Sequence, residues 1–325
     1  MATAFVFPGQ GSQSVGMGRD LYELSAAARA VFDQADAILG FALSHLCFEG
    51  PEDVLTATEN AQPALLTVSA ALLAVLAERH GDTETRRQTD DRLLSRSPGL
   101  PVSLSFVAGH SLGEYSALLA AGALDFTTAA RLVRKRGELM SEAREGGMAA
   151  IIGLDEAPLE QICREVSAEG AVVVIANYNS PGQLVISGAG AAIERACALA
   201  KQRGAKRVLP LKVSAAFHSP LMREAAEGLA AAMAEAAMAD AQTSVISNVT
   251  AEPLRAAEAI RHELVAQVTS PVRWIASVRR MAADGVDTFV EVGPGSVLTG
   301  LIKRIAPDAR LVNVNDLASL RSFSG

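Results

Sequence analysis

The segment Gly109-His110-Ser111-Leu112-Gly113 constrains the fold of this chain more than any other feature of its sequence. The Gly-x-Ser-x-Gly pattern is typical of a nucleophile elbow, a sharp strand-to-helix turn that exposes a serine hydroxyl. Residues 102–108 alternate and are rich in strand formers, and residues 114–121 are mostly good helix formers. A side chain at either glycine would crowd the turn. The sequence therefore predicts strand, elbow and helix here, with Ser111 as the candidate nucleophile.

A serine hydroxyl needs a neighbouring base with a pKa near neutrality to accept its proton. The chain has five histidines. His110 lies inside the elbow, and its position next to Ser111 makes it a poor candidate to face the hydroxyl. His218 comes just before a helix that Pro220 opens, while the other three lie in ordinary polar or helical contexts. His218 is therefore the best candidate base for Ser111.

One arginine stands out in the helix that residues 125–140 predict, with Asp125, Thr127 or Thr128 as its cap. At 100° per residue, Arg136 falls in the middle of the apolar stripe of this helix. A buried guanidinium keeps its charge and needs an anion. Two partners are open at this point, an internal Asp or Glu and the carboxylate of a substrate.

Strands alternate with helices through most of the chain, which predicts a parallel sheet covered on both faces. Residues 4–7 form a short apolar strand that runs into the glycine-rich turn 8–13, and we expect this turn to supply one hydrogen-bond donor to the site. The turn is not a phosphate-binding loop, because the Lys-Ser/Thr end of that motif is absent. An apolar helix is predicted over 63–79.

Residues 146–213 predict a nearly self-contained unit inserted into the larger part. Their order of elements, βαββαβ, is that of a ferredoxin-like unit. The expected domains are a large α/β domain from 1–145 and 214–325 and a small domain from 146–213. The predicted strands cover 148–154, 172–177, 183–187 and 205–213, and the predicted helices cover 158–168 and 191–202.

Charge and composition exclude several classes of protein. The net charge of −7 argues against nucleic acid as the main partner. We expect no membrane-spanning segment, since no apolar run approaches the needed length, and the first residues do not resemble a secretion signal. The chain is therefore expected in the cytoplasm. Its three cysteines are widely spaced and indicate packed, reduced thiols.

Two polar segments have no role in this scheme. Residues 81–101 are rich in Asp, Glu, Thr, Arg and Ser and predict a solvated loop or linker. A basic cluster lies at the end of the small unit and forms either a solvated face or a surface for an acidic partner. Its members are Lys201, Arg203, Lys206, Arg207 and Lys212.

Several blocks together resemble the malonyl-CoA:acyl carrier protein transacylase family, which is similar to the acyltransferase domains of polyketide synthases. The similarity runs in the family's order from Met1 to about Ile305, so it is far more specific than the elbow alone. The blocks are Phe5-Val6-Phe7-Pro8-Gly9-Gln10-Gly11-Ser12-Gln13, Gly109-His110-Ser111-Leu112-Gly113-Glu114-Tyr115-Ser116-Ala117, Arg136-Gly137, Asn177-Tyr178-Asn179-Ser180-Pro181-Gly182-Gln183 and Glu291-Val292-Gly293-Pro294-Gly295.

The resemblance implies an α/β-hydrolase-like large domain and a ping-pong transfer of malonyl from malonyl-CoA to holo acyl carrier protein in fatty acid synthesis. Ser111 would carry the acyl group and His218 would move the proton, without a metal or other cofactor. Gln10 and Leu112 would donate backbone N–H groups to the oxyanion, and Arg136 would bind the malonyl carboxylate.

The resemblance also implies three further residues. The main-chain carbonyl of Gln267 would orient His218 in place of a triad acid. In related domains, a phenylalanine beside that histidine, here Phe217, is found in enzymes that use malonyl as the acyl group. Gln62 matches a glutamine near the site. We expect a monomer that binds neither nucleic acid nor membrane.

Three alternatives stay open. Residues 81–101 form a longer insert than the family usually has, which leaves open a trans-acting polyketide synthase acyltransferase. A hydrolase of esters or acyl thioesters would use the same elbow with water as acceptor. A carrier-docking module with a dead site is the non-enzymatic alternative, and the intact Ser111, His218 and Arg136 argue against it.

Overall fold

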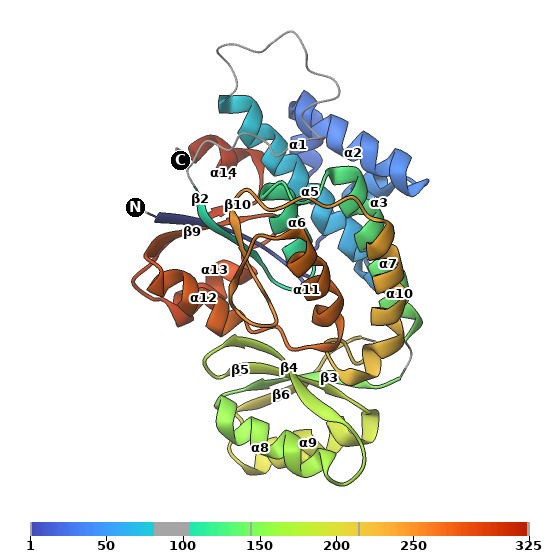
Figure 1. Cartoon of the computed structure of the whole chain (residues 1–325), viewed down its shortest axis with the longest axis vertical. Coiled ribbons are helices and arrows are strands. Elements are labelled where there is room, and N and C mark those ends of the chain that lie inside the picture. The colour runs from blue at the N-terminus through green and yellow to red at the C-terminus, as the bar shows by residue number, and fades with distance from the viewer. Residues whose placement is uncertain (1, 81–103, 144, 214, 324–325) are drawn as a thin grey trace.

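The apolar segment at the start of the chain forms an inner strand of a six-stranded sheet (Figure 1). The computed structural model describes residues 2–80, 104–143, 145–213 and 215–323, so the polar insert 81–101 lies outside the described residues. The strand order is β10-β9-β1-β2-β7-β8, parallel except for the antiparallel pair β7–β8. The strands are β1 (Ala2–Phe7), β2 (Leu104–Gly109), β7 (Ser244–Ile246), β8 (Pro253–Leu254), β9 (Val286–Val292) and β10 (Arg310–Val314).

Both faces of this sheet are covered, as the alternation along β1 illustrates. Phe5 and Phe7 point into a large cluster with the apolar side chains of α5, whereas Ala4 and Val6 join Trp274 on the opposite face. The helices around the sheet are α1 (Arg19–Leu24), α2 (Ala26–Leu39), α3 (Leu43–Glu49), α4 (Glu52–Thr56), α5 (Thr58–His80), α6 (Gly113–Ala120), α7 (Phe126–Glu142), the short 3-10 helix Pro220–Met222, α10 (Arg223–Glu235), α11 (Ala257–Thr269), α12 (Trp274–Ala283), α13 (Val297–Ile305) and α14 (Leu317–Ser322).

Helix α5 starts earlier than the predicted 63–79 and includes Pro63. Proline at this position removes the N–H that would bond to the Glu59 carbonyl one turn back. The Arg134 guanidinium of α7 donates to that carbonyl instead, at 3.0 Å. A neighbouring helix thus satisfies the backbone group that the proline leaves free, and the helix continues.

The expectation that no apolar run approaches membrane-spanning length was wrong for α5. Its stretch Thr58–Glu78 is long and apolar enough to cross a membrane by length and composition. However, 94% of an apolar window of 18 residues within this stretch is buried inside the protein, which is the environment of a core helix. The all-round apolar character of α5 follows from packing against several neighbours, chiefly α7 and α2.

Residues Gly147–Pro210 form a second, antiparallel sheet with two helices on one face (Figure 1). The chain order is the predicted βαββαβ, and the strand order is β4-β5-β3-β6. The last strand is shorter than the predicted 205–213. The elements are β3 (Gly147–Ile152), α8 (Glu156–Ser167), β4 (Val173–Ser180), β5 (Gln183–Gly188), α9 (Gly190–Gln202) and β6 (Arg207–Pro210).

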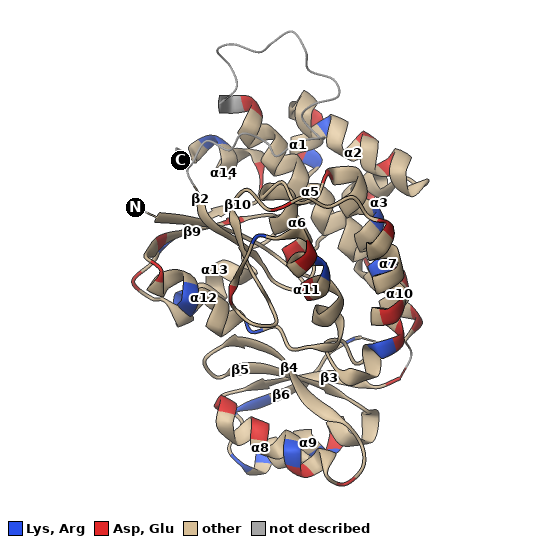
Figure 2. Ribbon diagram, in the orientation of Figure 1, with Lys and Arg blue, Asp and Glu red and all other residues tan. Residues whose placement is uncertain are grey.

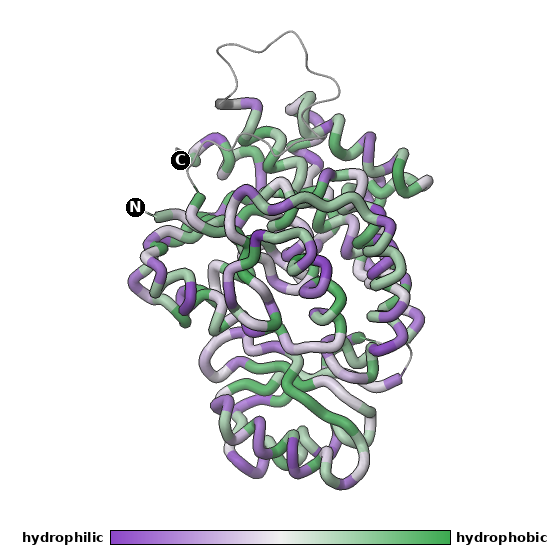
Figure 3. Tube along the Cα trace, viewed as in Figure 1, coloured by the Kyte–Doolittle hydropathy of each residue, from purple (hydrophilic) through white to green (hydrophobic). Residues whose placement is uncertain are grey.

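The small sheet is joined to the segment that precedes α12. The Tyr178 N–H of β4 donates to the Val272 carbonyl at 2.9 Å, and the Val272 N–H donates to the Ala176 carbonyl at 2.8 Å. The strands of both sheets are largely apolar, while α8 and α9 carry many polar residues (Figure 3). The two units are therefore joined by backbone hydrogen bonds next to the candidate site.

Candidate active site

The predicted elbow forms between β2 and α6. Ser111 has a φ of 52°, in the left-handed region that non-glycine residues rarely adopt. A Cβ on Gly109 would lie 1.9 Å from the Gly113 carbonyl carbon, and one on Gly113 would lie 2.1 Å from the Phe7 oxygen. Both glycines are needed because backbone approaches backbone at these two points.

The predicted base reaches the nucleophile. His218 Nε2 lies 2.8 Å from Ser111 Oγ, and His218 Nδ1 lies 2.8 Å from the main-chain oxygen of Gln267. A carbonyl oxygen can only accept, so Nδ1 carries the proton and Nε2 presents its lone pair to the serine hydroxyl. His218 also has a left-handed backbone, with a φ of 57°.

The environment keeps His218 uncharged. Burial, and after it the positive charge of Arg136, lower the pKa of His218 to about 3, against a raising contribution from the Gln267 backbone hydrogen bond. The imidazole is therefore neutral at physiological pH and free to accept a proton from Ser111.

Arg136 lies next to Ser111, and the side chain is 1% exposed. Its guanidinium donates to Gln62 Oε1 at 2.7 Å, to Gln267 Oε1 at 2.9 Å and to Ser111 Oγ at 3.1 Å. Among the described residues, no carboxylate forms an ion pair with it. Its Nε–H is buried without a partner. An internal Asp or Glu, one of the two partners considered, is therefore not the ion-pair partner of this cation.

Close packing of α5 and α7 brings Gln62 to the arginine. A Cβ on Gly137 would lie 2.7 Å from the Glu59 Cα, so glycine at this position lets the two helices approach. Gln62 is buried on α5, and its Nε2 lies 3.6 Å from the Met140 sulfur. Gln62 thus contacts Arg136 and not Ser111.

Asn248 supports the elbow, a role that the sequence did not reveal. Its Oδ1 accepts from the Ser111 N–H at 2.7 Å, and its Nδ2 donates to the Gly109 carbonyl at 2.7 Å. Asn248 follows β7, which pairs with β2, so it reaches the same sheet edge as the elbow. The sequence signal that could have indicated this role is a polar residue at the carboxyl end of a strand next to the elbow strand.

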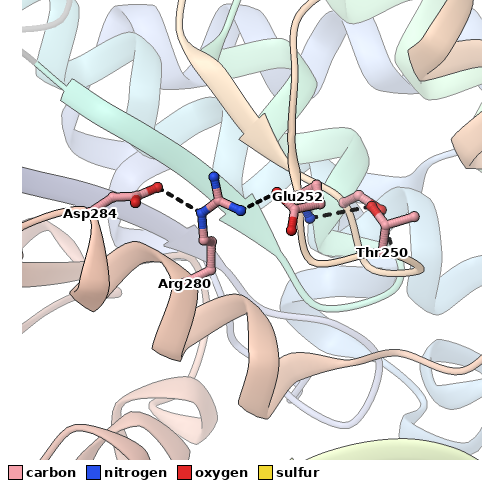
Figure 4. Close-up of polar contacts among 5 residues, drawn as sticks. Thr250, Glu252, Arg280 and Asp284 are labelled. Atoms are coloured by element: carbon pink, nitrogen blue, oxygen red, sulfur yellow. Dashed lines mark hydrogen bonds and ion pairs between the residues drawn. The ribbon is translucent and has the colours of Figure 1, made fainter.

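The turn that carries Asn248 is held from both sides. On the side of α11, the Val249 N–H donates to Glu263 at 2.9 Å. On the other side, Arg280 of α12 pairs with Glu252 and with Asp284, the latter at 2.8 Å (Figure 4). These contacts fix the loop between β7 and β8 relative to α11 and α12.

Glu114 is the second residue that the sequence did not single out. It is buried in the first turn of α6, and its carboxylate accepts a hydrogen bond from Gln267 Nε2. Burial raises the pKa of Glu114 well above its usual range, and the nearby Glu263 adds to this, while Gln267, the Asn248 backbone and Arg136 lower it. Glu114 is thus a buried acid one side chain away from the arginine.

Of the remaining expected site residues, Leu112 and Phe217 are sequence neighbours of Ser111 and His218, and Gln10 lies in the turn after β1. Among the described residues, no hydrogen bond takes up the backbone N–H of Gln10 or of Leu112. The Gln10 side chain is exposed and donates to Thr58 at 3.2 Å. Phe217 is buried beside His218.

His110 faces away from the nucleophile, as predicted. Its Nε2 lies 2.8 Å from Asn179 Oδ1, and its ring lies 5.8 Å from that of Trp274. Burial lowers the pKa of His110. This residue therefore links the elbow to the end of β4.

The three cysteines are free thiols. In the part of the chain that the structure describes, no cluster of three or more His, Cys, Asp or Glu side chains is arranged to hold a metal ion.

Known proteins give an independent comparison. The model of the acyl transferase domain family matches residues 4–320. A malonyl CoA-acyl carrier protein transacylase of Bacillus subtilis strain 168 is 47% identical over 96% of this chain and 93% of its own length. The enzyme of that name from Escherichia coli K12 is 45% identical over 98% of this chain and 97% of its own length.

Solved structures agree with this. The acyl-carrier-protein S-malonyltransferase of Bartonella henselae matches with a TM-score of 0.91 and 45% identity over 99% of this chain and 98% of its own. A malonyl-transacylase solved in complex with a type II polyketide synthase acyl-carrier protein matches with a TM-score of 0.90 and 43% identity, over 99% and 98% of the two chains. The parallel sheet, the elbow and these similarities over nearly the full length show that the chain belongs to the acyl transferase domain family, among the malonyl CoA-acyl carrier protein transacylases.

Proposed function

We propose that this protein transfers the malonyl group from malonyl-CoA to the phosphopantetheine thiol of holo acyl carrier protein and so supplies extender units for fatty acid synthesis. One observation carries the proposal: a buried guanidinium that pairs with no carboxylate of the described residues lies 3.1 Å from a serine hydroxyl that a neutral histidine contacts. A catalytic serine accounts for acyl transfer, and the cation beside it accounts for an acyl group with a free carboxylate.

The first half-reaction acylates the serine. Ser111 Oγ attacks the thioester carbonyl while its proton moves to His218 Nε2, and the N–H groups of Gln10 and Leu112 stabilise the oxyanion by about 3 kcal/mol per well-placed donor. The carbon–sulfur bond then breaks, and His218 returns the proton to the coenzyme A thiolate. The Gln267 carbonyl keeps His218 in the required tautomer throughout.

The second half-reaction reverses these roles. The phosphopantetheine thiol gives its proton to His218 Nε2, and its sulfur attacks the malonyl ester. The ester carbon–oxygen bond then breaks, and His218 returns the proton to Ser111 Oγ. Malonyl leaves as a thioester on the carrier, and the enzyme needs no metal or other cofactor for either step.

Arg136 gives the selectivity for malonyl. Two charge-assisted hydrogen bonds to the malonyl carboxylate would use donors of the guanidinium, for which the free Nε–H is available. Acetyl-CoA lacks this carboxylate and would leave a buried cation without an anion. Gln62 would hold the guanidinium, and Phe217 would line the acyl site.

The proposal assigns these steps to a large α/β-hydrolase-like domain, residues 1–145 and 214–325, with a ferredoxin-like domain, residues 146–213, beside the site. The strand order β4-β5-β3-β6 with both helices on one face supports the second assignment. Ser111, His218 and Arg136 all come from one chain, which supports action as a monomer. We propose a cytoplasmic enzyme that uses neither nucleic acid nor membrane.

The partition of labelled malonyl tests transfer against hydrolysis. Malonyl-CoA labelled in the acyl group is incubated with the enzyme and holo acyl carrier protein, and the label on the carrier is compared with free malonate. Transfer predicts that the carrier takes nearly all the label. Release of free malonate at an equal or higher rate would favour an acyl-thioester hydrolase, and carrier binding without turnover would favour a docking module.

A further inference from the structure

The side chain of Gln267 stands between the arginine and a buried acid. Its Oε1 accepts from the Arg136 guanidinium at 2.9 Å. Its Nε2 donates to the Glu114 carboxylate and to the Ser111 carbonyl, the latter at 3.1 Å. One amide thus contacts the cation on one side and the acid on the other.

The chemistry of the partners fixes which way this amide points. A guanidinium can only donate, and the Ser111 carbonyl can only accept. The oxygen of Gln267 must therefore face Arg136, and the nitrogen must face Ser111 and Glu114. The reverse orientation would place donor against donor and acceptor against acceptor.

The other contacts of the cation are also neutral. Gln62 supplies an amide oxygen, and Ser111 supplies a hydroxyl. Neutral oxygens satisfy the N–H donors of a buried guanidinium without cancelling its charge, whereas a direct carboxylate partner would cancel much of it. Among the described residues, Glu114 is the only carboxylate that influences the pKa of Arg136.

We propose that the Gln267 side chain is a positioning residue that keeps the Glu114 carboxylate from pairing with Arg136, so that the guanidinium stays available for the substrate carboxylate. This inference rests on the proposed function for its consequence in catalysis. Gln267 would thus have two separate roles. Its main-chain carbonyl contacts His218, and its side chain keeps Arg136 and Glu114 apart.

The test is a rescue experiment. In Gln267→Ala the carbonyl that contacts His218 remains, but Glu114 is free to pair with Arg136, and kcat/KM for malonyl-CoA falls by about 30-fold or more, mostly through KM. Malonyl loses its advantage over acetyl to the same extent. Adding Glu114→Gln removes the acid that would ionise on pairing with Arg136, so the double variant regains most of the malonyl activity and selectivity.

Gln62→Ala is the matched control, because the Gln62 oxygen also accepts a hydrogen bond from Arg136, but the Gln62 nitrogen lies against the Met140 thioether and not against an acid. Adding Glu114→Gln to Gln62→Ala should rescue nothing. Gln267→Ser serves as a second variant if Gln267→Ala does not fold. A double variant as impaired as Gln267→Ala, or equal rescue of the Gln62 variant, would overturn the inference.

A crystal structure of Gln267→Ala gives a readout that does not depend on activity. The expected result is the Glu114 carboxylate in direct contact with the Arg136 guanidinium. An unmoved Glu114, with water in place of the amide, would overturn the inference. Failure of the wild-type enzyme to transfer malonyl would instead contradict the proposed function, so the two failures are distinguishable.

Discussion

At the scale of single residues, the chemistry depends on three side chains that burial places in unusual states. Ser111 and His218 both have left-handed backbones, and Arg136 is a buried cation that pairs with no carboxylate in the part of the chain that the structure describes. Each state is costly on its own, and the surrounding contacts maintain it. The strained backbone at Ser111 and His218 and the buried charge of Arg136 together suit a site that binds an anionic acyl group.

Replacing the arginine separates binding of the carboxylate from acyl transfer. In Arg136→Ala we expect malonyl transfer to fall by about 100-fold or more, because two charge-assisted hydrogen bonds are lost. Acetyl transfer should persist or rise. Competition between malonyl-CoA and acetyl-CoA, followed by mass spectrometry of the acyl-enzyme, measures both. An equal loss of both activities would mean that Arg136 only maintains the structure.

The pH profile of acylation tests the state of His218. Its pKa lies below the ordinary range, so the imidazole stays neutral as the pH falls through 6.5 and takes up a proton only near pH 3. We expect the acid limb of the pH profile of kcat/KM to lie well below pH 6.5. Short pH jumps measure this limb, and circular dichroism controls for unfolding. In Arg136→Gln the limb should move to higher pH, since a positive neighbour is lost. A wild-type limb near pH 6.5 would contradict this.

The same shift links His218 to stability. Between pH 6.5 and about 3, His218 binds a proton in the unfolded chain but not in the folded chain. The contribution of the buried neutral imidazole to stability is therefore fully present above pH 6.5 and is lost as the pH falls through this window.

At the scale of elements, the site depends on how β7 and α11 approach the elbow. Asn248, after β7, satisfies two backbone groups of the elbow, and Gln267, on α11, contacts the other three site residues. Neither set of contacts follows from local periodicity, since the residues that they join lie between 49 and 156 positions apart.

Loss of the Asn248 side chain should loosen the elbow. In Asn248→Ala the Ser111 N–H and the Gly109 carbonyl lose their partner, and the acylation rate should fall by about 10- to 100-fold with little change in KM. Rapid-quench measurement of acyl-enzyme formation tests this. Thr250→Ala is the control, because the side chain of this exposed residue in the same turn accepts a hydrogen bond from the Glu252 N–H (Figure 4), and its loss should leave the rate unchanged. Equal effects of the two substitutions would refute a specific role for Asn248.

At the scale of the whole molecule, local sequence patterns predicted the elbow, the inward direction of Arg136 and the order of elements in the small unit, and they gave Asp125 as one of three candidate caps of α7. They did not predict that α5 continues through Pro63, because the compensating Arg134 lies on another helix. They also missed Asn248 and Glu114, whose partners are set by tertiary packing. Residues whose role comes from one local pattern were predictable, and residues whose role comes from a distant contact were not.

We propose the exposed basic residues of the small unit as a surface for the carrier. Lys206 and Arg207 are exposed at the start of β6, an edge strand of the small sheet (Figure 2). If an acidic carrier binds here, Lys206→Glu with Arg207→Glu should weaken carrier binding by about 10-fold or more at low salt. Lys135→Glu on α7 is the control, since this lysine is also exposed. Unchanged affinity, measured by calorimetry, would exclude this surface.

The central claim is that Ser111 takes up malonyl because His218 accepts its proton and Arg136 binds the far carboxylate. Intact mass spectrometry after mixing with malonyl-CoA alone, followed by peptide mapping, tests it most directly. The account predicts one malonyl group on Ser111 in the wild-type enzyme, none in Ser111→Ala, and loss of the group when holo acyl carrier protein is added. An adduct that persists in Ser111→Ala, or no adduct in the wild-type enzyme, would contradict it.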